Sequence, residues 1–192
     1  NFIMISAILL AAGESKRMKD ENKLTKKFKG IPLIKHSVDN ILSSDIDELI
    51  IVLGYQKKII QNIIKKNNKI KFVFNKDFKS GMASSIGVGL NNLSKNTENF
   101  FICLGDMPMV KKNIYNLLLE FKKNNEIIVP TYKNIQGNPV LFSSSMKHKI
   151  IKIKGDFGAR VIFDTNKNKI MNIDTNDLSI TQNFNTIKDF NF

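Results

Sequence analysis

The sequence has few of the residues that would support several structural classes. It contains one cysteine (Cys103), no tryptophan and only two arginines, Arg17 and Arg160, among 30 basic residues. A single cysteine excludes an internal disulfide and is typical of a reducing compartment. No apolar run approaches the ~20 residues of a membrane helix, and the first residues lack the basic leader of a signal peptide. We therefore expect a cytoplasmic protein with no membrane partner.

Length and composition point to one globular unit. The 192 residues can build one α/β domain with a sizeable core but leave little room for two. A hydrophobic content of 42% and a charged content of 24% are ordinary for such a protein. With no internal repeat and no linker visible, we expect a single domain over residues 1–192.

The net charge of +13 raises the question of nucleic-acid binding. The lysines, however, are scattered along the whole chain and do not form one basic stripe. The aromatic residues are mostly Phe within apolar runs, which indicates core packing and not base stacking. We expect no nucleic-acid partner, and the charge to help attract polyanionic small substrates.

Apolar runs alternate with amphipathic stretches along the chain. The runs predict strands at Phe2–Leu10, Glu48–Leu53, Ile70–Asn75, Phe100–Leu104, Glu126–Pro130 and Lys169–Ile173, with a turn into another strand at Gly137–Phe142. Helical spacing predicts helices at Leu33–Leu42, Gln56–Lys66, Ala83–Leu93, Lys112–Lys123, Ser143–Ile151 and Val161–Asp164. The alternation predicts an α/β fold with a Rossmann-like, doubly wound, mostly parallel sheet and helices on both faces. Cys103 lies within a predicted strand and is expected in the core.

The loop after the first predicted strand has the character of a phosphate site. Leu10, Ala11, Ala12 and Gly13 lead into a polar stretch that holds Arg17 and Lys23. Small residues let the backbone approach a ligand, its free N–H groups bind anions, and the two cations neutralise phosphate charge. The loop lacks the P-loop and GxGxxG patterns, and an ordinary solvated charged loop remains the alternative interpretation.

Two other segments follow predicted strands. Asp106, in Gly105-Asp106-Met107-Pro108, comes directly after a buried strand, where open α/β sheets place their ligand chemistry, and Pro108 stiffens that turn. Ser80, Ser84 and Ser85 gather at the start of a predicted helix. We expect serine to cap this helix, whose free N–H groups can hold an anion or a base edge.

These segments resemble a known family. Leu10–Gly13 with Ser15, Arg17 and Asn22-Lys23-Leu24 is similar to the signature of the MobA-like nucleotidyltransferases, and within them to the molybdenum cofactor cytidylyltransferases. Four further segments match in order: Ser80–Ser85 (SGMASS), Gly105–Pro108 (GDMP), Gly137–Val140 (GNPV) and Gly155–Arg160 (GDFGAR). The resemblance covers residues 10–160 and implies a fold like that of the nucleotide-diphospho-sugar transferases.

The resemblance also implies residue roles. Catalysis would rest on Lys23, Arg17 and Asp106, with Asp106 holding Mg²⁺. The nucleotide would contact Leu10, Ala11, Ala12, Gly13, Arg17, Lys23, Ser80, Gly81, Ser84 and Ser85, and Ala12 would favour cytosine. The acceptor would contact Asn138, Asp156 and Arg160.

The implied reaction moves CMP from CTP to the phosphate of molybdopterin and releases pyrophosphate. The acceptor phosphate is already an anionic nucleophile, so catalysis reduces to positioning and charge neutralisation. CTP and a molybdopterin-type acceptor are the expected small-molecule substrates, and a molybdoenzyme is a possible protein partner.

One segment departs from the cytidylyltransferase pattern. Where that branch ends in an Asp-Ile-Asp-Thr-like motif, this chain has Asn183-Phe184-Asn185-Thr186, which resembles the guanylyl branch. Asp174 comes too early to align with the motif. A second carboxylate ligand is therefore in question. The alternatives left open are another base or acceptor (GTP, a sugar phosphate or a polyol phosphate) and a non-catalytic carrier of the cofactor.

Overall fold

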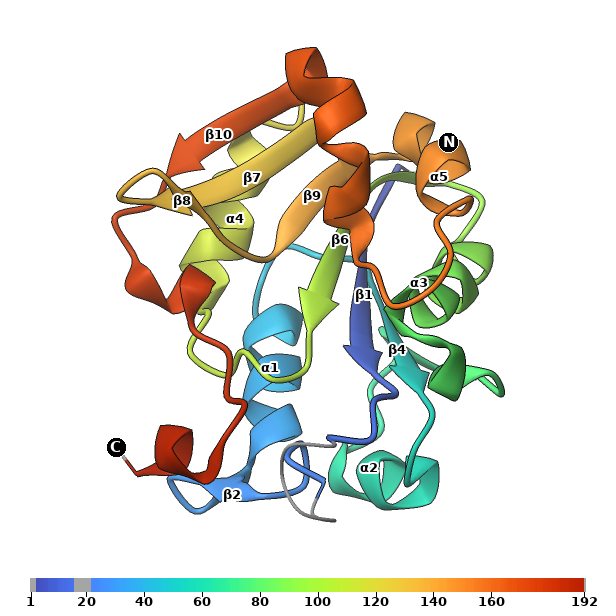
Figure 1. Ribbon diagram of the computed structural model, residues 1–192, viewed down its shortest axis with the longest axis vertical. Coiled ribbons are helices and arrows are strands. Elements are labelled where there is room, and N and C mark those ends of the chain that lie inside the picture. The colour runs from blue at the N-terminus through green and yellow to red at the C-terminus, as the bar shows by residue number, and fades with distance from the viewer. Residues whose placement is uncertain (1–2, 16–21, 192) are drawn as a thin grey trace.

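The computed structural model describes residues 3–15 and 22–191. Its main sheet contains β1 (Met4–Ala11), β4 (Glu48–Leu53), β5 (Ile70–Phe74), β6 (Thr97–Leu104), β7 (Ile127–Tyr132), β8 (Ile135–Gln136), β9 (Val140–Ser143) and β10 (Ile170–Asp174). Seven of these strands lie in the order β10-β7-β9-β6-β1-β4-β5, and β8 pairs with β7 (Figure 1).

The sheet is mostly parallel, as the sequence predicts. β1 pairs in parallel with β4 and β6, β4 with β5, and β7 with β10. β9 runs antiparallel to both β6 and β7. Every residue of β4 is buried, which is the pattern of a parallel strand covered on both faces.

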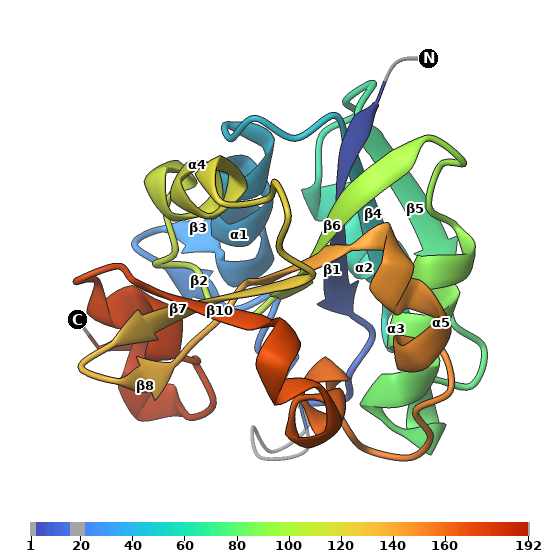
Figure 2. The ribbon, with the colours of Figure 1, turned by 90° about the horizontal axis from the view of Figure 1, so that it is seen from above.

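Helices cover both faces of the sheet. They are α1 (Leu33–Leu42), α2 (Lys57–Ile63), α3 (Met82–Asn91), α4 (Lys112–Glu120) and α5 (Lys147–Ile150). Alternate residues of β1 separate the two cores: Leu9 packs in the cluster that includes residues of α1, α2 and α4, and Ile8 in the cluster that includes residues of α3 and α5. Figure 2 shows α1 and α4 on one side of the sheet and α3 and α5 on the other. The predicted doubly wound arrangement is confirmed.

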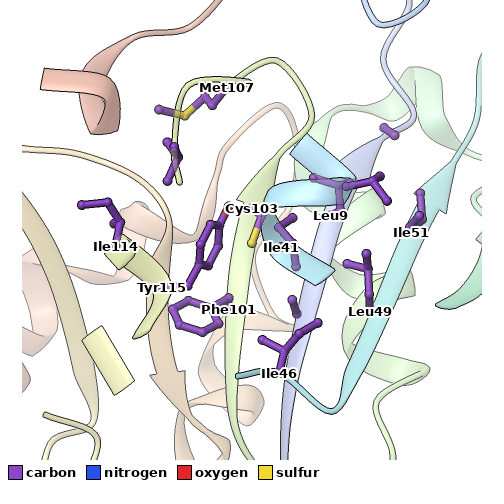
Figure 3. Close-up of a cluster of buried hydrophobic side chains, with 14 of the residues drawn as sticks. Leu9, Ile41, Ile46, Leu49, Ile51, Phe101, Cys103, Met107, Ile114 and Tyr115 are labelled. Atoms are coloured by element: carbon purple, nitrogen blue, oxygen red, sulfur yellow. The ribbon is translucent and has the colours of Figure 1, made fainter. Parts of the chain in front are cut away.

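The larger core includes the single cysteine. Cys103 is 2% exposed and lies beside Phe101 and Tyr115, whose rings meet edge to face at 5.4 Å (Figure 3). Burial raises the pKa of the Cys103 thiol far above its usual range, so this thiol stays protonated and unreactive. The prediction that Cys103 is a core residue is confirmed.

Several short elements differ from the prediction. A hairpin of β2 (Lys27–Phe28) and β3 (Ile31–Pro32) precedes α1, and 3₁₀ turns take the place of the helix expected at 161–164. The helix expected over 143–151 is a 3₁₀ turn followed by α5. These segments are too short for a hydrophobic period to define them. Among the described residues, no helix is both long and apolar enough to cross a membrane.

The chain order places a crevice beside β1. From β1 the chain moves through β4 to β5 on one side, and then crosses to β6 on the other side. This reversal is a topological switch point, where loops diverge and leave room for a ligand at the carboxyl ends of the strands. The loop after Ala11 and the turn containing Asp106 both lie at this edge.

Candidate active site

A cavity of about 750 Å³ opens at this edge of the sheet. The loops after β1 and β6, the start of α3 and the C-terminal segment build its wall. We call it the first cavity. Its lining residues are Leu10, Ala11, Ala12, Gly13, Glu14, Ser15, Lys23, Leu24, Phe78, Lys79, Ser80, Gly81, Met82, Ser85, Leu104, Gly105, Asp106, Asp156, Asn183 and Asn185.

The charged centre of the first cavity joins three distant parts of the chain. Lys23 Nζ lies 2.6 Å from Asp106 Oδ2 and 3.0 Å from Asn185 Oδ1. Asn183 Nδ2 donates to Asp106 Oδ1 at 3.1 Å. The side chains of Lys23 and Asp106 are 18% and 14% exposed, so this ion pair is only partly screened by solvent.

The C-terminal segment is fixed against the turn that holds Asp106. The backbone N–H of Phe184 donates to the Asp106 carbonyl at 2.8 Å, and its ring packs edge-on against Phe28 and Phe190. Asp189 Oδ2 accepts hydrogen bonds from the backbone N–H groups of Thr186 (2.7 Å) and Asn185 (2.8 Å). These bonds lower the pKa of Asp189 below its usual value.

The donor set at this centre suits a hard divalent cation. Asp106 Oδ2 and Asn185 Oδ1 converge on one cationic atom, Lys23 Nζ, which shows that the two oxygens can share a positive charge. No group of three or more His, Cys, Asp or Glu side chains that could hold a metal occurs in the described residues. Mg²⁺ commonly takes one or two carboxylates and completes its shell with substrate phosphates and water, which one carboxylate and one amide oxygen permit.

The loop after β1 is the segment that the sequence predicts to bind phosphate. Gly13 is not among the glycines with positive φ; Ser15 takes that conformation instead, at φ 55°. Ser15 Oγ accepts a hydrogen bond from the backbone N–H of Lys23 at 3.2 Å, which ties the two ends of the loop together. A Cβ on Gly13 would meet no described atom within 4 Å, so the glycine leaves space in the cavity. Arg17 lies outside the described residues.

The start of α3 is capped by a residue from another loop. No side chain of the serine cluster caps this helix. The Met82 N–H donates to Asp156 Oδ1 at 3.1 Å, and the Ala83 N–H donates to the Gly155 carbonyl at 3.2 Å. The prediction of serine capping is wrong, because the distant loop at 155–156 supplies the acceptors.

Ser80 and Ser84 instead donate their hydroxyl hydrogens to backbone carbonyls that precede them in the chain. Ser80 Oγ donates to the Asp77 carbonyl and Ser84 Oγ to the Gly81 carbonyl, at 2.7 and 2.8 Å. Ser85 is 5% exposed and lines the first cavity, whereas Ser84 is not among the lining residues. Asn75, which the sequence interpretation missed, donates to the hydroxyls of both Ser84 and Ser85.

A second cavity of about 340 Å³ lies beside the first. Met82 and Leu104 line both. The remaining lining residues of the second cavity are Ile86, Ile102, Asn138, Val140, Phe142, Phe157, Gly158, Ala159, Arg160 and Val161. Three apolar side chains in this wall are unusually exposed: Phe157 at 58%, Val161 at 50% and Met82 at 38%.

The predicted acceptor residues divide between the two cavities. Asn138 and Arg160 line the second cavity, and Asp156 lines the first. The Arg160 guanidinium donates to the Gly137 carbonyl and lies 5.6 Å from the Phe163 ring. Burial lowers the pKa of Arg160 from its usual value. The contacts that the structure describes for the Arg160 guanidinium are thus with other protein groups, although Arg160 lines the second cavity.

The sequence comparison assigns the family. Residues 7–170 match the profile of the MobA-like NTP transferase domain. The chain belongs to the MobA-like NTP transferase family. Nucleotidyl transfer is the reaction class of this family. The first cavity is lined by most of the residues that the resemblance assigns to nucleotide binding.

Relatives of this MobA-like chain include proteins with different named activities. A probable molybdenum cofactor guanylyltransferase from Methanosarcina mazei is 29% identical over 77% of this chain and 67% of its own length. The bifunctional protein GlmU of Caldicellulosiruptor saccharolyticus is 28% identical over 69% of this chain, which corresponds to only 28% of that protein. The chain thus matches less than a third of the GlmU sequence.

Solved structures share the fold of this MobA-like chain. The crystal structure of Rv0371c from Mycobacterium tuberculosis has a TM-score of 0.87 at 20% identity, covering 98% of this chain and 96% of that one. A second structure of Rv0371c, described as a complex with manganese, has a TM-score of 0.77 at 19% identity and covers 91% and 89%. The neighbours include nucleotidyltransferases of the nucleotide-diphospho-sugar transferase fold, as the sequence predicts.

Proposed function

We propose that this protein transfers CMP from CTP to the phosphate of a molybdopterin-type acceptor and releases pyrophosphate. The observation that carries the proposal is the convergence of Lys23, Asp106 and Asn185 in a cavity large enough for a nucleotide. A cation and a metal-binding carboxylate side by side match the needs of a triphosphate whose charge must be neutralised during transfer.

Each group at this centre has a distinct task in the proposed reaction. An oxygen of the acceptor phosphate attacks the α-phosphorus of CTP, and the bond to the bridging oxygen of the β-phosphate breaks. Lys23 binds triphosphate oxygens and offsets the charge that builds up on the leaving pyrophosphate. Asp106 and Asn185 would hold Mg²⁺, which supplies Lewis-acid neutralisation of phosphate oxygens when bound. The manganese complex of Rv0371c supports a divalent ion for this fold.

The second cavity favours an acceptor with a flat ring that can stack, in preference to a sugar or polyol phosphate. Its wall is mostly aliphatic and aromatic, and Phe157, Val161 and Met82 remain exposed around it. Exposed apolar groups of this kind mark ligand or partner sites, and a pterin ring can stack on Phe157. A polyol would leave many hydroxyls without partners there. Because Met82 and Leu104 line both cavities, an acceptor in the second cavity lies next to the nucleotide.

Cytosine is the base that we propose, because Ala12, which follows β1 and lines the first cavity, is the residue that the resemblance to the cytidylyltransferases associates with that base. GTP is the second candidate, because the relative from Methanosarcina mazei is named a guanylyltransferase and Asn183 and Asn185 are the residues expected of that branch.

The test is pyrophosphate release from CTP, GTP, ATP and UTP with Mg²⁺ and molybdopterin, in wild type and Asp106→Ala. Release that favours CTP and disappears in the variant is the expected result. Preference for GTP would assign guanine as the base in place of cytosine. Transfer to a sugar phosphate in preference to molybdopterin would assign a sugar phosphate as the acceptor. Tight binding of molybdopterin without turnover on any nucleotide would instead indicate a carrier.

A further inference from the structure

A buried amide lies behind the start of α3. Asn75 directly follows β5 and is 2% exposed. Its Oδ1 accepts a hydrogen bond from the backbone N–H of Asp77 at 2.9 Å. Because a backbone N–H can only donate, this contact fixes which end of the amide is the oxygen. The nitrogen of the Asn75 side chain must therefore face α3.

The Asn75 nitrogen divides its two hydrogens between two serines with different surroundings. It lies 2.8 Å from Ser84 Oγ and 3.0 Å from Ser85 Oγ. Ser84 directs its own hydroxyl hydrogen to backbone carbonyls, with the Gly81 oxygen at 2.8 Å. Ser85 finds no acceptor for its hydroxyl hydrogen in the part of the chain that the structure describes.

The unused hydrogen of Ser85 belongs to a group that lines the first cavity. The side chain is 5% exposed, and a buried donor without a partner is costly. Since Asn75 Nδ2 occupies a lone pair of the Ser85 oxygen, the hydroxyl is left to act as a donor. A ligand that places an acceptor beside Ser85 would satisfy it.

We propose that Asn75 is a positioning residue that holds the Ser85 hydroxyl as a hydrogen-bond donor toward the base of the bound nucleotide. The hydroxyl then requires a base that presents a carbonyl oxygen or an unprotonated ring nitrogen at this point, and cytosine can do so through O2 or N3. This inference deepens the proposed function and rests on the first cavity being the nucleotide site.

The test compares CTP with ribose 5-triphosphate, which has no base, by isothermal titration calorimetry in the presence of Mg²⁺. In Asn75→Asp, a carboxylate oxygen replaces the donor, so the Ser85 hydroxyl turns toward it and presents lone pairs to the cavity. The dissociation constant for CTP should rise about tenfold, the scale of one hydrogen bond, and that for ribose 5-triphosphate should change by less than about twofold. Asn172→Asp is the matched control, because it adds the same charge on β10 and retains the acceptor for Gln136; it should change neither constant.

Ser85→Ala provides a second variant should Asn75→Asp fold poorly, and it should lose the same base-dependent affinity. Adding Asn75→Asp to Ser85→Ala should cause little further loss, because the amide acts through the hydroxyl. The inference is overturned if CTP and ribose 5-triphosphate lose affinity together, if CTP affinity is unchanged, or if the wild type binds both equally. None of these readouts requires transfer, so a failure of the acceptor assignment is distinguishable from a failure of this inference.

Discussion

The carboxylate of Asp156 accepts a hydrogen bond from the backbone N–H of Met82, a residue 74 positions earlier in the chain, at 3.1 Å. Asp156 lines the first cavity, while its neighbours Phe157 and Gly158 line the second. Together with the hydrogen bond from the Ala83 N–H to the Gly155 carbonyl, this contact attaches the loop between the two cavities to the helix that borders both. The same loop carries the exposed ring that we propose to meet the acceptor.

The first prediction concerns Gly81, where the backbone before α3 passes close to the backbone of Asp156. Gly81 has φ 112°, and a Cβ there would lie 2.6 Å from the backbone of Asp156. We expect Gly81→Ala to destabilise the fold by about 2–4 kcal/mol, because the backbone conformation is strained for alanine and the loop must shift. Thermal unfolding should show a melting temperature lower by roughly 5–12 °C.

Gly87→Ala is the matched control, since Gly87 is also in α3 and a Cβ there would meet no described atom within 4 Å. It should be neutral or stabilising by up to ~1 kcal/mol, because alanine is the better helix former. Equal destabilisation by both substitutions would contradict the role assigned to the contact between Gly81 and Asp156.

The second prediction concerns the charge of Asp106. Asp106→Asn keeps the shape of the side chain but removes the carboxylate that pairs with Lys23 and would hold the metal. We expect kcat to fall by about 10²–10³-fold, the scale of losing one preorganised electrostatic contact. Steady-state pyrophosphate release measures it. The control, Asp39→Asn, removes an exposed carboxylate paired with Lys35 on α1 and should leave kcat within about twofold; an active Asp106→Asn would remove Asp106 from the proposed metal site.

Local sequence pattern was sufficient for the sheet and for most helices. The run Glu48–Leu53 is buried at every position, and its short length and the glycine that follows it favour a strand covered on both faces over a helix. The two-residue strands β2, β3 and β8 were missed because they contain too few positions for any period.

The parts of the site that the sequence did not predict depend on contacts between residues that are far apart in the chain. Lys23 and Asn185 are 162 positions apart, and no local pattern records that their side chains meet. Asn75 was missed for a related reason: it looks like the polar end of a strand until the structure places α3 against it. The capping of α3 was assigned to serines because they are near in sequence, whereas Asp156 is near in space.

The third prediction concerns the acceptor and Phe157. The ring is 58% exposed at the second cavity, so Phe157→Ala should change stability by less than about 0.5 kcal/mol. The KM for molybdopterin should rise about threefold to tenfold through loss of ring stacking, while the KM for CTP remains unchanged. Ile135→Ala removes a similarly exposed apolar side chain from β8 and should affect neither constant. A parallel rise in both KM values would argue against a separate acceptor cavity.

The fourth prediction concerns how pH affects the stabilisation that Asp189 gives to the segment containing Asn185. The backbone N–H groups of Thr186 and Asn185 donate to Asp189, and this lowers the pKa of Asp189 in the folded protein. Because the folded pKa is below the unfolded value of about 4, the stabilisation is fully present above that value and is lost as the pH falls through the folded pKa. Wild type should therefore melt at a higher temperature than Asp189→Asn at pH 7, and the difference should narrow as the pH falls below about 4.

Since the same hydrogen bonds hold Asn185 beside Lys23, Asp189→Asn should also slow transfer at pH 7. A difference in melting temperature that is constant from pH 7 to pH 2.5, with unchanged transfer, would mean that Asp189 does not hold this segment in place.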